Sequence, residues 1–262
     1  MMKSISVTFD TNAANLIADP AQYSNLDEPP GTAGRLRTAI AEGQIIGFVS
    51  EASVFIECLS LPDKLTYLTV ALTPKVRPSP DLRRIAIYAE LTRLGVRLLH
   101  APLLGAEIFI DMPWATDDRV PQEDRVARFQ SFIKPYRRHH ALVAAGEKRL
   151  RIKPLAQRMA GMPSGKILKG FNDWALVLKR DWDDGDTAQQ KILRKEVEPL
   201  IAEWCDTLIV GSHYSYGIQF LCTMDVGKQS GSTSLFHNSN RANLEAQGIK
   251  VASPAQLVAM IS

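Results

Sequence analysis

The sequence predicts an α/β fold with a mostly parallel sheet, interrupted by a large, mainly helical insertion. Strand-like and helix-like segments alternate at both ends of the chain, which is typical of a parallel sheet with helices on both faces. Helical patterns dominate the middle of the chain instead. A chain of 262 residues is long enough for one large domain that carries such an insertion.

The amino-terminal part predicts two strands, each followed by helix. Apolar runs predict strands at 4–9 and 44–50, and each run ends in polar residues. Helical patterns follow at 11–18, 33–42 and 51–61. Pro62 is expected to end the third of these helices.

The carboxyl-terminal part continues the alternation. It predicts, in order, a helix, a strand, a helix, a strand and a last helix, at 205–217, 218–223, 239–248, 249–253 and 254–261. Pro254 suits the start of the last helix, because proline is favoured in a first helical turn.

The middle of the chain is expected to be an insertion over 63–199, between core segments 1–62 and 200–262. One strand is predicted within it, at 95–101. Its helical patterns cover 81–94, 121–145, 147–160, 171–180 and 187–204.

Composition places the chain among ordinary globular proteins. Its net charge of +3 permits a nucleic-acid partner without arguing for one. Cys58, Cys205 and Cys222 have no C-x-x-C spacing and lie beside apolar residues, so we expect buried free thiols and a cytoplasmic location. No apolar stretch approaches 18 residues, so no membrane span is expected.

Four acidic residues lie near the predicted ends of strands. Asp10 follows the first strand, and Asp225 lies just past the strand 218–223. Glu57 falls in the helix after the second strand, and Asp206 begins the helix that leads into 218–223. Because the carboxyl ends of parallel strands share one edge, we expect the four carboxylates to converge there. Such a cluster favours Mg²⁺ or Mn²⁺, and two such ions support phosphodiester cleavage.

Each acid also has a structural explanation. Asp10 and Asp206 stand where a helix N-cap belongs, and Asp225 precedes Val-Gly as a turn residue would. Glu57 is flanked by apolar residues, so a solvated helix face explains it less well. For Asp10, Asp206 and Asp225, both the metal-binding and the structural interpretation stay open.

The motifs "VTFDTN", "FIECL", "WCDTLIVGSHYSYGIQFLCTMD" and "GIKVASPAQLV", in this order, resemble the PIN domain family of metal-dependent nucleases. The resemblance covers roughly 1–62 and 200–262 and implies a three-layer α/β/α core. It departs from the family in the long gap between Glu57 and Asp206.

The resemblance implies a Mg²⁺- or Mn²⁺-dependent endoribonuclease that cuts RNA, expected to be single-stranded. It implies catalytic and metal-binding roles for Asp10, Glu57, Asp206 and Asp225, with Asn12 and Thr223 orienting ligands or a phosphate. Glu51 is a lower-ranked substitute for Glu57. Many PIN proteins are toxins held by an antitoxin, so a protein inhibitor is a conceivable partner. The sequence leaves homo-oligomerisation open.

A basic segment lies in the expected insertion. Between residues 134 and 170 there are ten Lys or Arg and one acid, Glu147. Such a run is either a solvated helical surface or a track for a phosphate backbone. The candidates for RNA binding are Arg137, Arg138, Lys148, Arg149, Arg151 and Lys153.

Two other functions are weighed. A catalytically weak PIN-like module would bind RNA or protein through the insertion. A haloacid dehalogenase-like phosphatase also begins with an Asp at the end of its first strand, but it requires a second acid two residues later. That position holds Asn12, so this hypothesis carries low weight.

Overall fold

The fold is built on five parallel strands in the order β3-β2-β1-β4-β5. The computed structural model describes residues 4–22, 28–57, 59–70, 82–101, 112–116, 119–136, 141, 145, 173–227 and 234–261. The strands are β1 (Ile5–Phe9), β2 (Ile45–Ser50), β3 (Arg97–Leu99), β4 (Phe220–Cys222) and β5 (Lys250–Ala252). The predicted α/β class and its parallel sheet are confirmed, and each predicted strand contains one of these five.

The helices of the described residues follow the predicted order. They are α1 (Thr11–Ala18), α2 (Thr32–Ala41), the π-helix η1 (Ser53–Glu57), α3 (Leu61–Val70), α4 (Leu82–Arg93), α5 (Gln122–Ile133), α9 (Asp173–Asp183), α10 (Thr187–Tyr216), α11 (Asn238–Ala246) and α12 (Pro254–Met260). The helix expected at 147–160 lies outside the described residues. α3 has no counterpart among the predicted helices, and the prediction that Pro62 ends the helix at 51–61 is wrong, because η1 already ends at Glu57. Pro62 instead lies in the first turn of α3, where its missing N–H removes no helical hydrogen bond.

One long helix, α10, corrects two predictions. The helices expected at 187–204 and 205–217 are a single helix of 30 residues, with Pro199 inside it. Its N-cap is Asp186, and Gly217 ends it in the left-handed region at φ 65°. Asp206 therefore lies within a continuous helix, and the interpretation of Asp206 as an N-cap is wrong. Apolar residues on both sides of Asp206 bury this stretch, so tertiary packing continues the helix through it.

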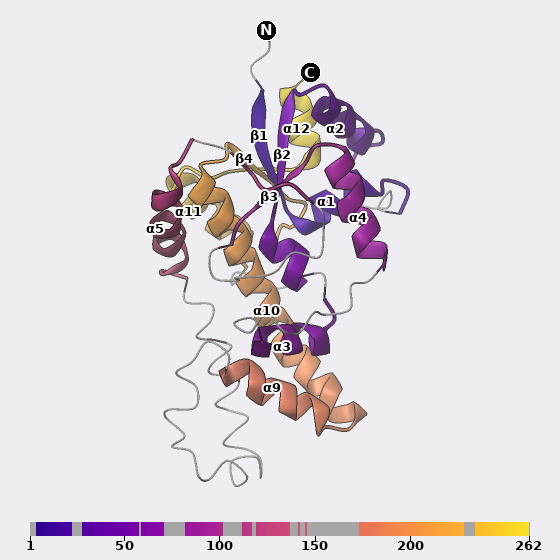
Figure 1. Ribbon diagram of the computed structural model, residues 1–262, viewed down its shortest axis with the longest axis vertical. Coiled ribbons are helices and arrows are strands. Elements are labelled where there is room, and N and C mark those ends of the chain that lie inside the picture. Colours follow the sequence, from indigo (N-terminus) through magenta and orange to yellow (C-terminus); the bar gives the residue numbers. More distant parts are fainter. Residues whose placement is uncertain are drawn as a thin grey trace.

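Helices cover both faces of the sheet (Figure 1). α1 contacts α2 and α4, and α12 contacts α2, so these four helices form one layer. α10 contacts β2, β3 and α5 on the other face, while α11 contacts β5. This is the arrangement that right-handed crossovers produce when the chain first winds from β1 to β3 and then returns to β4 and β5.

The sheet draws on three segments of the chain rather than on its two ends. β3 lies within the range 63–199, which was expected to be an insertion, yet it pairs with β2 from Phe48↔Arg97 to Ser50↔Leu99. α4, from the same range, packs on α1. Among the described elements, α9, the first half of α10 and α3 extend away from the sheet (Figure 1).

The core surrounds β1, whose Val7 and Phe9 are fully buried. Gly47 on β2 permits close packing there, because a Cβ would lie 3.0 Å from Phe9 Cε2 and 3.1 Å from Val96 Cγ2. Cys205 and Cys222 are buried free thiols, as expected, and Cys58 lies outside the described residues. None of the described helices has the length and apolar character needed to cross a membrane.

Candidate metal centre

The carboxyl edge of the sheet contains its topological switch point, between β1 and β4. The chain winds outward from β1 in one direction and from β4 in the other, so the connections after these strands diverge and leave a crevice. Asp10 follows β1 directly, and its backbone N–H donates to the Cys222 carbonyl at 2.9 Å. Residues 223–225 follow β4, so the first and fourth strands deliver polar residues to one place.

Three carboxylates meet at this edge. Asp10, Glu57 and Asp206 each offer one oxygen, and these oxygens lie within 4.8 Å of one another. Asp10 is 3% exposed, Asp206 9%, and Glu57 is half-buried. They come from the start of α1, the end of η1 and the middle of α10. An oxygen-only donor set of this charge fits a hard divalent ion such as Mg²⁺ or Mn²⁺.

The cluster resists ionisation. Burial raises the pKa of Asp10 to about 6. Burial, followed by the charge of Asp10, raises the pKa of Glu57 to about 7. Burial and then the Asp10 and Glu57 charges raise the pKa of Asp206 well above its ordinary value. A bound cation would relieve this repulsion, since an opposite charge favours the ionised carboxylates.

Hydrogen bonds fix the orientation of Asp10. Its Oδ1 accepts from the Thr11 backbone N–H at 2.7 Å, so Asp10 is the N-cap of α1 as the capping interpretation predicted. Its Oδ2 accepts from the Thr223 hydroxyl at 2.7 Å. The Thr11 hydroxyl in turn donates to Glu57 Oε2, which links two members of the cluster through α1. Asp10 thus combines the capping role with membership of the cluster.

Asn12 joins the two strand ends, whereas Asp225 stands apart from the three clustered acids. Asn12 Oδ1 accepts from the Met224 N–H at 3.0 Å, and a hydrogen bond from Asn12 lowers the pKa of Asp10. Asp225 Oδ1 accepts from the Gly227 N–H at 2.6 Å, the contact of a turn residue. The negative charge of Asp225 still raises the pKa of Asp10 and of Asp206.

The sequence analysis missed three charged residues around the cluster. Glu203 is buried one turn before Asp206, raises its pKa, and accepts from the Leu235 N–H at 3.2 Å. Lys64 on α3 and Arg84 on α4 lower the pKa of Glu57 by their charge. The i, i+3 spacing of Glu203 and Asp206 was a usable signal, while nothing in the sequence links Lys64 or Arg84 to Glu57.

Glu51 directly follows β2 and contacts residues past the end of β3, and it is not one of the three clustered acids. Its Oε2 accepts from the Ala101 N–H at 2.8 Å and lies 3.4 Å from His100 Nδ1, both past the end of β3. Glu57 rather than Glu51 therefore joins Asp10 and Asp206. The six basic residues proposed for RNA binding all lie outside the described part of the chain: Arg137, Arg138, Lys148, Arg149, Arg151 and Lys153.

Comparison with known proteins leaves this geometry without a named relative. No family model, no curated protein and no solved structure matches the chain.

Proposed function

We propose that the chain is a Mg²⁺- or Mn²⁺-dependent endoribonuclease with a PIN-like active site. The observation that supports it best is the trio Asp10, Glu57 and Asp206, whose oxygens lie within 4.8 Å of one another beside the switch point of a parallel sheet. A metal ion held there would activate water for attack on a phosphodiester. The sequence order of the acids and the Thr223-x-Asp225 motif after β4 support the PIN-like assignment.

The chain's own residues have distinct tasks in this proposal. Asp10, Glu57 and Asp206 hold the ion. Thr223 and Asn12 keep Asp10 oriented through the contacts at the ends of β1 and β4. Asp225 lies outside the trio and adds negative charge beside it.

Two cations give the site a means to bind substrate. Lys64 is 6% exposed and Arg84 is half-buried, and both act electrostatically on Glu57. Arg84 Nη1 reaches Asn15 Oδ1 at 3.4 Å, which directs the guanidinium toward α1. Cations beside a carboxylate cluster attract the phosphate groups of a nucleic acid, and arginine does so with a fork of donors.

The proposed substrate is single-stranded RNA in the cytoplasm, with an antitoxin-like inhibitor as the proposed partner. These assignments rest on the resemblance to the PIN family. A catalytically weak module that binds RNA or protein is the competing assignment, and the same assay separates the two.

The test is cleavage of labelled single-stranded RNA and DNA by the purified full chain, with Mn²⁺, Mg²⁺ or EDTA. We expect RNA cleavage with either metal and none in EDTA. The Asp10→Asn variant should abolish it, and Asp225→Asn should reduce it less. Glu245→Gln, an exposed acid on α11, is the matched control and should cut like the wild type.

Cleavage that survives Asp10→Asn would overturn the proposal, since the active centre would then lie elsewhere. RNA binding without cleavage, in the presence of either metal, would favour the binding module.

A further inference from the structure

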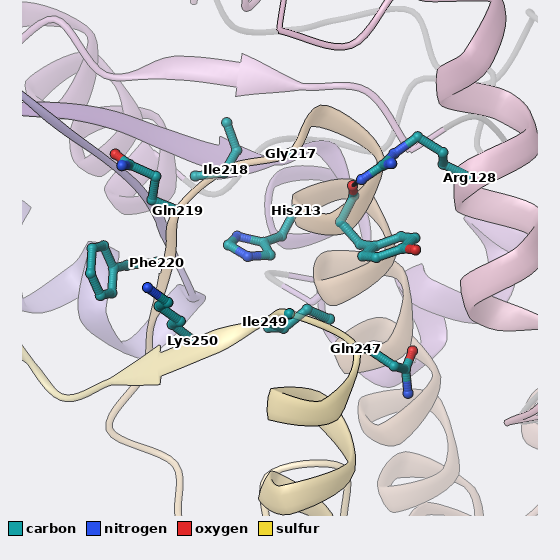
Figure 2. Close-up of a pocket in the computed structure, with 11 residues that line it drawn as sticks. Arg128, His213, Gly217, Ile218, Gln219, Phe220, Gln247, Ile249 and Lys250 are labelled. Carbon is teal, nitrogen blue, oxygen red and sulfur yellow. Dashed lines mark hydrogen bonds between the residues drawn. The ribbon is translucent and has the colours of Figure 1, made fainter.

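A second cavity lies at the amino edge of the sheet, opposite the carboxylate trio. It has a volume of about 540 Å³ and lies between the end of α10, the turns before β4 and β5, and α5. Figure 2 shows side chains from these elements around one space, with Arg128 on one side of His213 and Lys250 on the other. Pockets that bind small molecules have volumes of roughly 300–1,000 Å³.

Cations line this cavity, and no Asp or Glu is among its described lining residues. Arg128 on α5 donates from Nε and Nη2 to the Tyr214 carbonyl at 3.3 and 2.9 Å, so its guanidinium is held in place. Its Nη1 has no hydrogen-bond partner within the described part of the chain. Lys250 begins β5, with its ammonium 5.7 Å from the centre of the Phe220 ring and in no ion pair with a described residue.

A buried histidine points into the same cavity. His213 is 1% exposed, and its Nδ1 lies 3.0 Å from Thr8 Oγ1. Its Nε2 has no hydrogen-bond partner among the described residues, and Figure 2 shows the ring directed toward Phe220 and Lys250. Burial, and then the charge of Arg119, lower the pKa of His213 to about 3. The ring is therefore neutral and offers a hydrogen bond rather than a charge.

The rest of the lining combines aromatic and apolar side chains with the amides of Gln219 and Gln247. The rings of Tyr214 and Phe220 and the side chains of Ile218 and Ile249 line the cavity. The Arg128 guanidinium lies 4.6 Å from the centre of the Tyr214 ring, which keeps that ring in a fixed stack. An aromatic ring beside the Lys250 ammonium suits a ligand with an aromatic ring at one end and an anion at the other.

We propose that this cavity binds a nucleoside monophosphate, with Lys250 on the phosphate, the base against the aromatic walls and His213 Nε2 hydrogen-bonded to the base edge. The site is separate from the proposed nuclease centre and does not depend on it. Asp10 follows the carboxyl end of β1, while Lys250 and Phe220 begin their strands at the amino edge.

The test is calorimetric titration of the full chain with AMP, CMP, GMP and UMP in EDTA, so that metal-dependent binding at the carboxylate trio is excluded. Inorganic phosphate and the four nucleosides are the comparators. We expect at least one nucleotide to bind about tenfold or more tightly than phosphate or its own nucleoside.

Lys250→Gln is the main variant, because Lys250 is exposed and its loss should leave the fold intact. We expect about tenfold weaker nucleotide binding, corresponding to one charge-assisted contact. Arg97→Gln is the matched control, since Arg97 is an exposed cation that begins β3 at the same edge but does not line the cavity. His213→Gln should weaken binding of the nucleotide and leave binding of inorganic phosphate unchanged.

Four results would overturn the proposal. No nucleotide binds, or inorganic phosphate binds as tightly as the nucleotides. Arg97→Gln weakens binding as much as Lys250→Gln, which would indicate diffuse charge rather than a site. Asp10→Asn abolishes binding while Lys250→Gln does not, which would place the nucleotide at the carboxyl edge. Circular dichroism of each variant establishes that it is folded before it is titrated.

Discussion

The two edges of the sheet carry opposite charge. At the carboxyl edge, Asp10, Glu57 and Asp206 bring three buried or half-buried carboxylates together. At the amino edge, Arg128 and Lys250 line a cavity in which no described residue is acidic. One sheet therefore supports a site suited to cations and another suited to anions.

The backbone explains part of this difference. Helices that follow parallel strands begin at the carboxyl edge, and helices that precede them end at the amino edge. α1 begins at Asp10, whose carboxylate accepts the Thr11 N–H. α10 ends at Gly217, where Arg128 donates to the Tyr214 carbonyl. Helix N-termini favour negative groups and helix C-termini favour positive ones, which suits Asp10 and Arg128. Glu57 at the end of η1 and Asp206 within α10 do not lie at helix N-termini.

The largest expected effect tests the carboxyl edge. Asp206→Asn should lower metal-dependent cleavage at least about 100-fold, because loss of mere supporting contacts around a metal already costs 10–100-fold. Single-turnover cleavage rates and Mn²⁺ titration measure the loss. Glu203→Gln, one turn earlier and also buried, is the control and should lose less than about tenfold. Equal losses would mean that the two acids contribute only charge.

The second prediction concerns how much the three clustered carboxylates lower the stability of the fold when no metal is bound. The raised pKa of Asp10 contributes stability below about pH 4, and this contribution is lost as pH rises through about 6. Asp10→Asn should therefore raise the free energy of unfolding by about 2 kcal/mol at pH 7.5 in EDTA, and by little at pH 4. Urea denaturation at both pH values measures it. Saturating Mn²⁺ should stabilise the wild type and not the variant.

The third prediction concerns the packing that places Arg128 at the amino edge. A Cβ on Gly211 of α10 would lie 3.0 Å from Phe129 Cε2 and 3.1 Å from Ile133 Cγ2 of α5. Gly211→Ala should therefore destabilise the fold by about 1–2 kcal/mol. Gly34→Ala is the control, since nothing lies within 4 Å of its added Cβ, and it should stabilise α2 by about 0.5–1 kcal/mol. Thermal unfolding of both variants gives the sign of each change in stability.

The smallest expected effect tests whether His213, at the amino edge, is uncharged in the folded protein. His213 has a folded pKa of about 3, below its ordinary value of 6.5, so its contribution to stability is complete above pH 6.5 and declines toward pH 3. Between pH 7.5 and 5.5 the wild type should lose about 1 kcal/mol more than His213→Gln. Urea denaturation in EDTA at the two pH values measures the difference. An identical pH dependence would show that His213 gains its proton in both states.

Local sequence patterns predicted the strands and the acids that follow them, because apolar runs and strand-end polarity are properties of a few adjacent residues. Asp10 and Thr223 meet because their strands are neighbours, and the T-x-D motif pointed to that pairing. Asp206 was misplaced within its helix, because buried apolar residues on both sides carry α10 through a position that resembles a cap.

Other features have no local signal. Lys64 and Arg84 reach Glu57 only because α3 and α4 fold back over η1 and α1. The amino-edge cavity joins residues from three separate segments, at 128, 213–220 and 247–250, so no window of the sequence contains it. His213 is buried against Thr8, which lies 205 positions away in the sequence. The π-helical turn that presents Glu57 also looks like ordinary helix in the sequence.

The position of β1 in the middle of the sheet has a consequence during synthesis. The hydrogen bond from Thr223 to Asp10 joins residues 213 positions apart. The Asp10 carboxylate can therefore be held in this orientation only after β4 and Thr223 have been synthesised. At roughly 5–20 residues per second, this delay is roughly 10–40 s on the ribosome. The oriented carboxylate cluster therefore forms only after nearly all of the chain has emerged from the ribosome.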